Sequence, residues 1–230
     1  MNGYVLKMIA IVTMFIDHTA AILIPSDSTA YIICRSIGRL AFPIFCFLLV
    51  EGFLHTRNVK KYLARLGIFA LISEIPYDLA FSNKALHYGY KLQQNIFFTL
   101  FIGLAVIYLM SIIDSKFAKN VFICKGLDCL IVISGCTLAT ILATDYEFMG
   151  VLLIVAFYVF RSNKFLLTLA VLLVNISFGL GLQVLAALSM LFIFYYNGKR
   201  GLQGNKYIFY IFYPTHILLL YLISLLPILN

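Results

Sequence analysis

Ionisable side chains inside long apolar stretches are the residues of this sequence best suited to chemistry. A charge in the hydrocarbon of a membrane is costly unless it is paired or faces a wet cavity, so each one marks a candidate functional position. Histidine can remove a proton from an attacking amine or hydroxyl, carboxylates can orient it or bind a cation, and arginines can hold an anion. The residues of this kind are Asp17, His18, Arg35, Arg39, Glu51, Glu74, Asp78 and His216.

The spacing of the first four residues limits which of them share a helix face. Arg35 and Arg39 are four residues apart, so they lie on one face and can clamp an anion or neutralise carboxylates. Asp17 and His18 are adjacent, and neighbouring positions on a helix diverge by about 100°. Asp17 therefore needs a partner away from His18, and we expect Arg35 or Arg39 to provide it.

Prolines stand close to the later candidates. Pro76 lies between Glu74 and Asp78, which are four residues apart, and Pro214 lies two residues before His216. Because proline lacks an N–H, it kinks a helix and frees a carbonyl oxygen. We expect these helices to bend and line a polar cavity. For Arg35, Arg39, Glu74 and Asp78, interhelical salt bridges that fix packing and a direct role in substrate binding are about equally probable.

The composition predicts an integral membrane protein. Of the 230 residues, 63% are hydrophobic and 11% are charged, which leaves too little polar surface for a water-soluble globule. The apolar stretches are continuous and lack the alternation of barrel strands. We expect an all-α bundle of about nine transmembrane helices forming a single domain over residues 1–230. The stretches are 5–24, 31–54, 62–81, 94–113, 126–143, 147–160, 165–177, 179–196 and 207–228.

Lysines and arginines gather in every second loop, which predicts the orientation of the bundle. By the positive-inside rule these loops face the cytoplasm. We therefore expect a protein of the cell (inner) membrane with its amino terminus in the cytoplasm and its carboxyl terminus on the outer side. This alternation also argues against nucleic-acid binding, despite a net charge of +8. The side chains that this orientation assigns to the outer half, or to its level, are Asp17, His18, Arg35, Arg39, Glu74, Asp78, Asn95, Thr99, Asp145 and Glu147.

Two classes of function remain open on the residues alone. The five cysteines show no CxxC pairing and are interpreted as small core hydrophobes, so we predict neither a disulfide nor a metal site. A nucleophile elbow, an HExxH motif and a glycine-rich nucleotide loop are all missing. The charges suit either a membrane-embedded transferase or a proton-coupled transporter of a small solute, in which Asp17, His18 and Glu74 relay protons.

Several polar motifs follow one another along the chain. They are Lys7-x10-His18, Arg35-x3-Arg39-Leu-Ala-Phe-Pro, Glu51-Gly52, Ser73-Glu74-Ile-Pro-Tyr-Asp78, Asn95-Ile-Phe-Phe-Thr99 and Tyr213-Pro-Thr-His216. These motifs resemble those of the TraX family, in the same order over essentially the whole chain. The first two helices also resemble, more weakly, acyltransferase family 3 and the heparan glucosaminide acetyltransferases, although the spacing of the arginine pair differs from family 3.

The resemblance implies an N-acetyltransferase that uses acetyl-coenzyme A as donor and no metal. TraX acetylates the amino terminus of pilin, so the implied acceptor is an exposed amine, such as a membrane-anchored peptide. Lys7 lies about three turns before His18 on the same face, toward the cytoplasm. The roles implied are catalysis by His18 as general base with Asp17 and Arg39, donor binding by Lys7, Lys60 and Lys61, and acceptor or donor binding by Arg35, Glu74, Asp78, Asn95, Tyr213 and His216.

Overall fold

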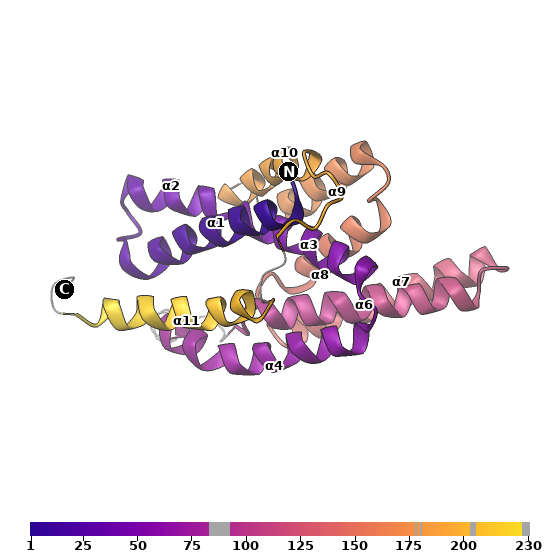
Figure 1. Ribbon diagram of the computed structural model, residues 1–230, viewed down its shortest axis with the longest axis horizontal. Helices are drawn as coiled ribbons and strands as arrows, with labels where there is room; N and C mark the ends of the chain where they lie inside the picture. Colours follow the sequence, from indigo (N-terminus) through magenta and orange to yellow (C-terminus); the bar gives the residue numbers. More distant parts are fainter. Residues whose placement is uncertain (83–92, 178, 180, 203–205, 227–230) are drawn as a thin grey trace.

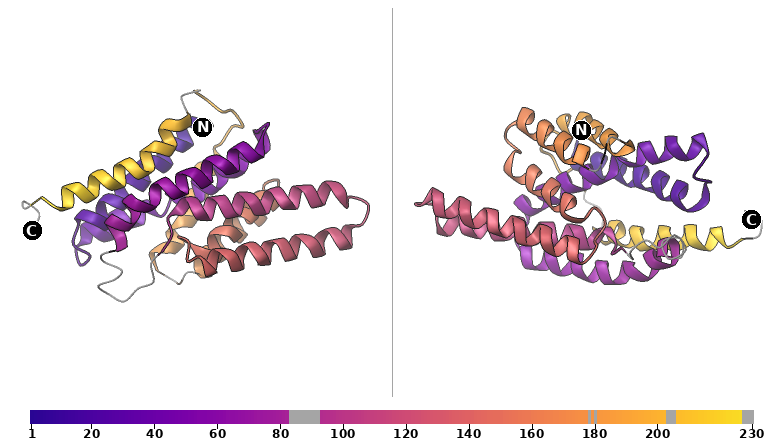
Figure 2. Two further views of the ribbon diagram at one scale, coloured as in Figure 1. Left: turned by 90° about the horizontal axis from the view of Figure 1, so that it is seen from below. Right: turned by 180° about the vertical axis from the view of Figure 1, so that it is seen from behind.

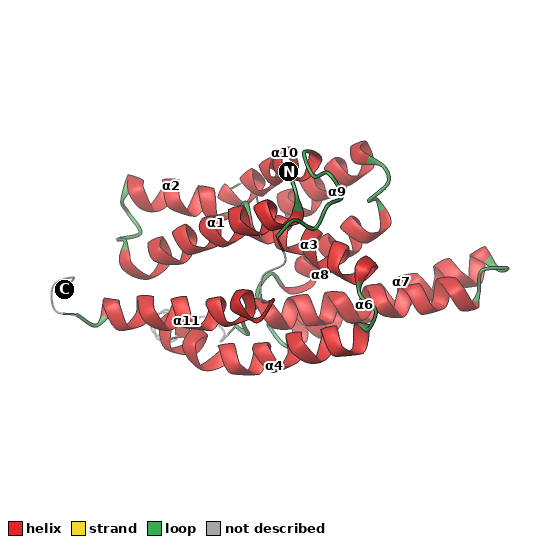
Figure 3. Ribbon diagram, viewed as in Figure 1, coloured by secondary structure: helices red, strands yellow, loops and turns green. Residues whose placement is uncertain are grey.

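The computed structural model describes residues 1–82, 93–177, 179, 181–202 and 206–226, and these residues form helices and their connections (Figures 1 and 3). The predicted all-α architecture is confirmed. Strand-like pairing in this part of the chain is one bridge between Gln94 and Thr144. The helices are α1 (Gly3–Leu23), α2 (Thr29–Gly38), α3 (Ala41–His55), α4 (Val59–Tyr77), the π-helix η1 (Asp78–Ser82), α6 (Ile96–Lys116), α7 (Val121–Ile141), α8 (Glu147–Val159), α9 (Lys164–Ser177), the 3-10 helix η2 (Leu182–Leu188), α10 (Ser189–Phe194) and α11 (Lys206–Ser224).

Five helical stretches of the described chain are long and apolar enough to cross a membrane: α1, α2 together with α3, α6, α7 and most of α11. The apolar helices α8 and α9 have 13 and 14 residues. At 1.5 Å per residue each covers only about 20 Å of a hydrocarbon layer about 30 Å thick. The count of nine spans and the sides of the two termini therefore stay predictions.

Polar residues between the apolar stretches start the helices. In six of the described helices a side-chain oxygen accepts a hydrogen bond from a first-turn N–H, which satisfies a donor that the helix itself leaves free. The stretch 31–54 is two helices rather than one, because α2 ends at Gly38 and α3 begins at Ala41. Pro43 lies in the first turn of α3, where its missing N–H costs little. The capping residues are Asn2, Ser28, Asn58, Asn95, Asn120 and Asn163.

The helices lie in two groups (Figure 2). Buried residues of most helices form one large apolar cluster, and residues of α6, α7 and α8 form a second, smaller cluster. α1 packs against α2, α3 and α11, and α6 packs against α4, α7 and α8. Glycines bring α6, α7 and α8 close together, since a Cβ at Gly103 would lie 2.2 Å from the Cδ1 atom of Ile154. α1 and α11 come from opposite ends of the chain and lie side by side, which places their polar residues in contact.

Candidate active site

His18 of α1 and His216 of α11 form the centre of the candidate site. Nδ1 of His18 lies 2.7 Å from Nε2 of His216. The two ring planes differ by 2° and the ring centroids are 5.0 Å apart. Rings stacked face to face cannot bring two nitrogens this close, so the rings meet edge to edge in one plane, which is the favoured geometry for a hydrogen bond. His216 is buried, whereas His18 is half-buried.

The hydrogen bonds define the tautomers of this pair when both rings are neutral. Nδ1 of His216 lies 2.7 Å from the carbonyl oxygen of Phe212, which can only accept, so this nitrogen carries the proton. Nε2 of His216 then accepts, and His18 donates from Nδ1. The Nε2 atom of His18 therefore keeps its lone pair, which is the form that a general base requires.

Aromatic side chains surround the two histidines. The ring of Tyr213, itself buried, lies edge-on to His18 with centroids 5.9 Å apart. Phe81 of η1 lies 5.8 Å from the same ring, and Phe212 stacks on His216 at 4.7 Å. An apolar surrounding strengthens a hydrogen bond electrostatically. The structure thus brings together three of the predicted site residues, His18, Tyr213 and His216.

Asp17 turns away from His18 and forms ion pairs with both arginines, as the sequence predicts. Its Oδ2 atom lies 2.6 Å from Nη1 of Arg35, and its Oδ1 atom lies 2.8 Å from Nη2 of Arg39. A Cβ at Gly38 would lie 2.1 Å from Oδ1, so only glycine at this position admits the carboxylate. The cluster fixes α1 against α2 beside the histidine pair.

Arg39 is also held by a chain of amides that sequence reasoning missed. Its Nη1 atom donates to Oε1 of Gln183 at 3.3 Å, and Nε2 of Gln183 donates to Oδ1 of Asn175 at 2.8 Å. Asn175 is almost fully buried and donates to the Val171 carbonyl oxygen at 2.7 Å. Buried amides require such partners, so an asparagine within an apolar stretch is the signal that could have revealed this chain.

We expect Asp17→Asn to destabilise the protein by about 3 kcal/mol. The substitution leaves two partly buried guanidinium groups without a counter-charge, and breaking a buried ion pair in this way is strongly unfavourable. The measurement is the thermal unfolding midpoint of the purified protein in detergent. Asp27→Asn, at an exposed carboxylate, is the matched control. An equal midpoint for both variants would contradict a stabilising role for the cluster.

The connection between α7 and α8 brings Asp145 and Tyr146 close to these arginines. The N–H of Asp145 donates to the carbonyl oxygen of Gln94 at 2.8 Å, and the hydroxyl of Thr99 donates to the carbonyl oxygen of Asp145. Tyr146 and Glu147 have φ values of 63° and 42°. Left-handed backbone at non-glycine residues is costly and persists only where its surroundings enforce it. Sequence analysis assigned Asp145 to the level of the outer half of the membrane but did not identify it as a site residue.

We expect the stability of the protein to fall as the pH rises through about 6, because of Asp145. Burial raises the pKa of Asp145 from 3.8 to about 6, the charge of Asp17 adds to this rise, and Arg39 and Arg35 oppose it. Since the folded state holds the proton more tightly than the unfolded state, the stabilisation is complete below pH 4 and lost above pH 6. Asp145→Asn should remove this part of the pH dependence in thermal unfolding measured from pH 4 to 7. Identical pH profiles for both proteins would contradict this assignment.

Glu74 and Asn95 join α4 to the start of α6. Asn95 is fully buried, and its Nδ2 atom donates to the Ala70 carbonyl oxygen at 2.8 Å and to Oε2 of Glu74. The other carboxylate oxygen of Glu74, Oε1, is buried and has no hydrogen-bond partner in the part of the chain that the structure describes. An unpaired buried oxygen is costly, so it is a candidate contact for a ligand. Asp78 follows at the first residue of η1.

The three lysines predicted to bind the donor differ in their exposure. Lys7 is partly buried on α1, with Nζ 4.4 Å from the ring centroid of Phe209 on α11. Lys60 and Lys61 are exposed in the first turn of α4. Only Lys7 therefore lies within the helix bundle that holds His18.

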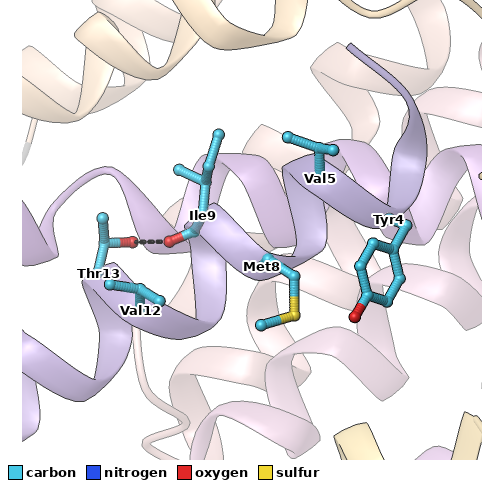
Figure 4. Close-up of a pocket in the computed structure, with 6 residues that line it drawn as sticks. All are labelled: Tyr4, Val5, Met8, Ile9, Val12 and Thr13. Carbon is cyan, nitrogen blue, oxygen red and sulfur yellow. Dashed lines mark hydrogen bonds between the residues drawn. The ribbon is translucent and has the colours of Figure 1, made fainter.

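A shallow apolar groove of about 340 Å³ runs along α1 between Tyr4 and Thr13 (Figure 4). Val5, Met8 and Val12 line it. At 100° per residue these three positions lie about 80° to 140° around α1 from His18, so the groove faces another direction. The groove is therefore separate from the histidine pair.

Comparisons with known proteins match nearly the whole length of this chain. The family model described as TraX protein matches residues 2–224. A relative from Dichelobacter nodosus, named "Probable fimbrial assembly protein FimC, serogroup H1", is 33% identical over 231 residues, covering 95% of this chain and 94% of the relative. No solved structure matches this chain.

Proposed function

Because this chain belongs to the TraX family, we propose that it is a membrane-embedded N-acetyltransferase. It moves an acetyl group from cytoplasmic acetyl-coenzyme A to an amine at the outer face of the inner membrane. The family resemblance supports the activity, and the name of the Dichelobacter relative supports a pilin amino terminus as the class of acceptor. The apolar helices support the membrane location.

The observation that carries this proposal is the lone pair on Nε2 of His18, an atom with no hydrogen-bond partner among the residues that the structure describes. As the acceptor nitrogen attacks the thioester carbonyl carbon, Nε2 takes the proton that the nitrogen loses. The tetrahedral intermediate then collapses, the carbon–sulfur bond breaks, and His18 returns the proton to the departing thiolate. His216 acts as a positioning residue, because its acceptor nitrogen keeps the proton of His18 on Nδ1.

Neighbouring charges support the same reaction. Arg39 and Arg35 give the region beside His18 a positive potential, which stabilises the developing oxyanion, while Asp17 holds both side chains in place. Glu74 binds the ammonium form of the acceptor through its unpaired Oε1 atom, with Asp78 nearby on η1. Asn95 orients Glu74.

We also propose that the bundle crosses the membrane nine times with its amino terminus in the cytoplasm. The N–H groups of Gly3 and Tyr4 donate to the carbonyl oxygens of Lys199 and Arg200, so the start of α1 and this basic loop lie at one end. Phosphates of coenzyme A bind at this end, at Lys7, with Lys60 and Lys61 contributing from the surface.

A proton-coupled transporter is the second candidate function. The specific observation that favours it is the hydrogen-bonded histidine pair, since two rings joined by nitrogen atoms can also pass a proton along. Asp17 and Glu74 would complete such a relay. A transporter requires no acetyl donor, which separates the two functions experimentally.

The test uses purified protein, acetyl-labelled coenzyme A and a synthetic peptide with a free amino terminus. We expect label to appear on the peptide, and none on the same peptide acetylated beforehand. Labelled peptide in excess of the protein-free reaction supports the transferase. No transfer to peptides, amino sugars or small amines, together with proton-driven solute uptake in liposomes, would overturn the proposal in favour of transport.

A further inference from the structure

Three side chains of types that can ligate a metal ion converge where α6 ends and α7 begins, outside the site described above. Asp114 belongs to the last turn of α6, and Cys124 and Asp128 belong to the first two turns of α7. One ligand atom from each lies within 4.8 Å of the other two. The thiol of Cys124 donates to Oδ1 of Asp114 at 3.1 Å.

The charge of this cluster is only partly compensated. Nζ of Lys125 lies 2.8 Å from Oδ2 of Asp128 and 3.3 Å from Oδ1 of Asp114, so two carboxylates share one ammonium group. The Asp128 side chain is 7% exposed, and its second oxygen, Oδ1, is buried with no hydrogen-bond partner among the described residues. Leaving a carboxylate oxygen unpaired away from water is costly. The cluster therefore has unused capacity for a cation.

The types of the donor atoms restrict which cation fits. Magnesium and calcium take oxygen ligands, whereas zinc accepts thiolate sulfur together with carboxylate oxygen. Three protein ligands and one water complete a four-coordinate zinc site. Lys125 is 65% exposed, so its ammonium group can move into water when a metal replaces it.

We propose that Asp114, Cys124 and Asp128 form a zinc-binding site that joins the ends of α6 and α7. On binding, the Cys124 thiol loses its proton to the solvent and the sulfur becomes a thiolate ligand. The bound ion links two helices whose shared end extends away from the rest of the bundle in Figure 2. α7 is the least buried of the five candidate spans, so a link at its start stabilises the helix pair.

The test is a titration of the chelator-treated full-length protein with Co²⁺, which reports thiolate coordination by near-ultraviolet charge-transfer absorption. We expect saturation at one ion per chain, displacement by Zn²⁺, and loss of the band in Cys124→Ala. Cys129→Ala, at an exposed cysteine of the same helix, is the matched control and should keep the band.

Two further variants keep the proposal falsifiable if Cys124→Ala fails to fold. Asp128→Asn should weaken Co²⁺ binding, and Lys125→Gln should strengthen it by removing the competing ammonium group. Absence of the band in the unmodified protein, its persistence in Cys124→Ala, or its loss only in Cys129→Ala would each overturn the site. None of these readouts depends on acetyl transfer.

Discussion

His18→Ala is expected to lower acetyl transfer by about 100- to 10,000-fold, the usual contribution of a general base. The variant removes the Nε2 atom that accepts the proton of the attacking amine. In this variant Nε2 of His216 loses its partner, but the His216 side chain is buried and its Nδ1 proton is bound to a carbonyl oxygen. It cannot take over the reaction. The measurement is the rate of label transfer from acetyl-coenzyme A to peptide.

His55→Ala is the control for this experiment. His55 lies at the exposed end of α3, where Nδ1 contacts the Glu51 carbonyl oxygen at 2.8 Å. We expect its replacement to leave transfer unchanged. Membrane insertion and the thermal midpoint must match the unmodified protein in both variants. Full transfer activity in a folded His18→Ala protein would remove His18 from the mechanism.

The second large effect is expected at His216, which acts through His18. Alanine at 216 removes the acceptor for the Nδ1 proton of His18 and should lower kcat by about 100-fold or more, as loss of the correct tautomer does in serine proteases. The KM values for donor and acceptor should change little. Glutamine can accept the same hydrogen bond through its side-chain oxygen, so His216→Gln should recover part of the lost kcat.

Nitrogen NMR of histidine-labelled protein distinguishes this positioning role from a purely structural one. The chain has four histidines, so single variants assign the resonances. We expect neutral His18 to carry its proton on Nδ1 in the unmodified protein and on Nε2, the form favoured in water, in His216→Ala. An Nε2 proton on His18 in the unmodified protein, or equal kcat values for the alanine and glutamine variants, would contradict the role of His216.

The structure corrects the sequence-based picture at particular residues. Asp17 was expected to pair with an arginine, and it pairs with two, because adjacent helix positions diverge and a carboxylate in an apolar stretch needs a counter-charge. Lys60 and Lys61 are exposed, and their assignment to the donor site stays a prediction. Asp145 owes its position to a strained loop that no periodicity predicts.

The sequence by itself determined the helical class, the breaks between apolar stretches and the ionisable residues within them. These properties depend on neighbouring residues, since hydrophobic runs, caps and prolines act within a few turns of the chain. Only the tertiary structure decided that His18 meets His216, 198 positions later, and that Asp114 meets Cys124 and Asp128. Such contacts follow from the packing of α1 on α11 and of α6 on α7. The register of helix packing is set by side chains of the whole core, which no local pattern contains.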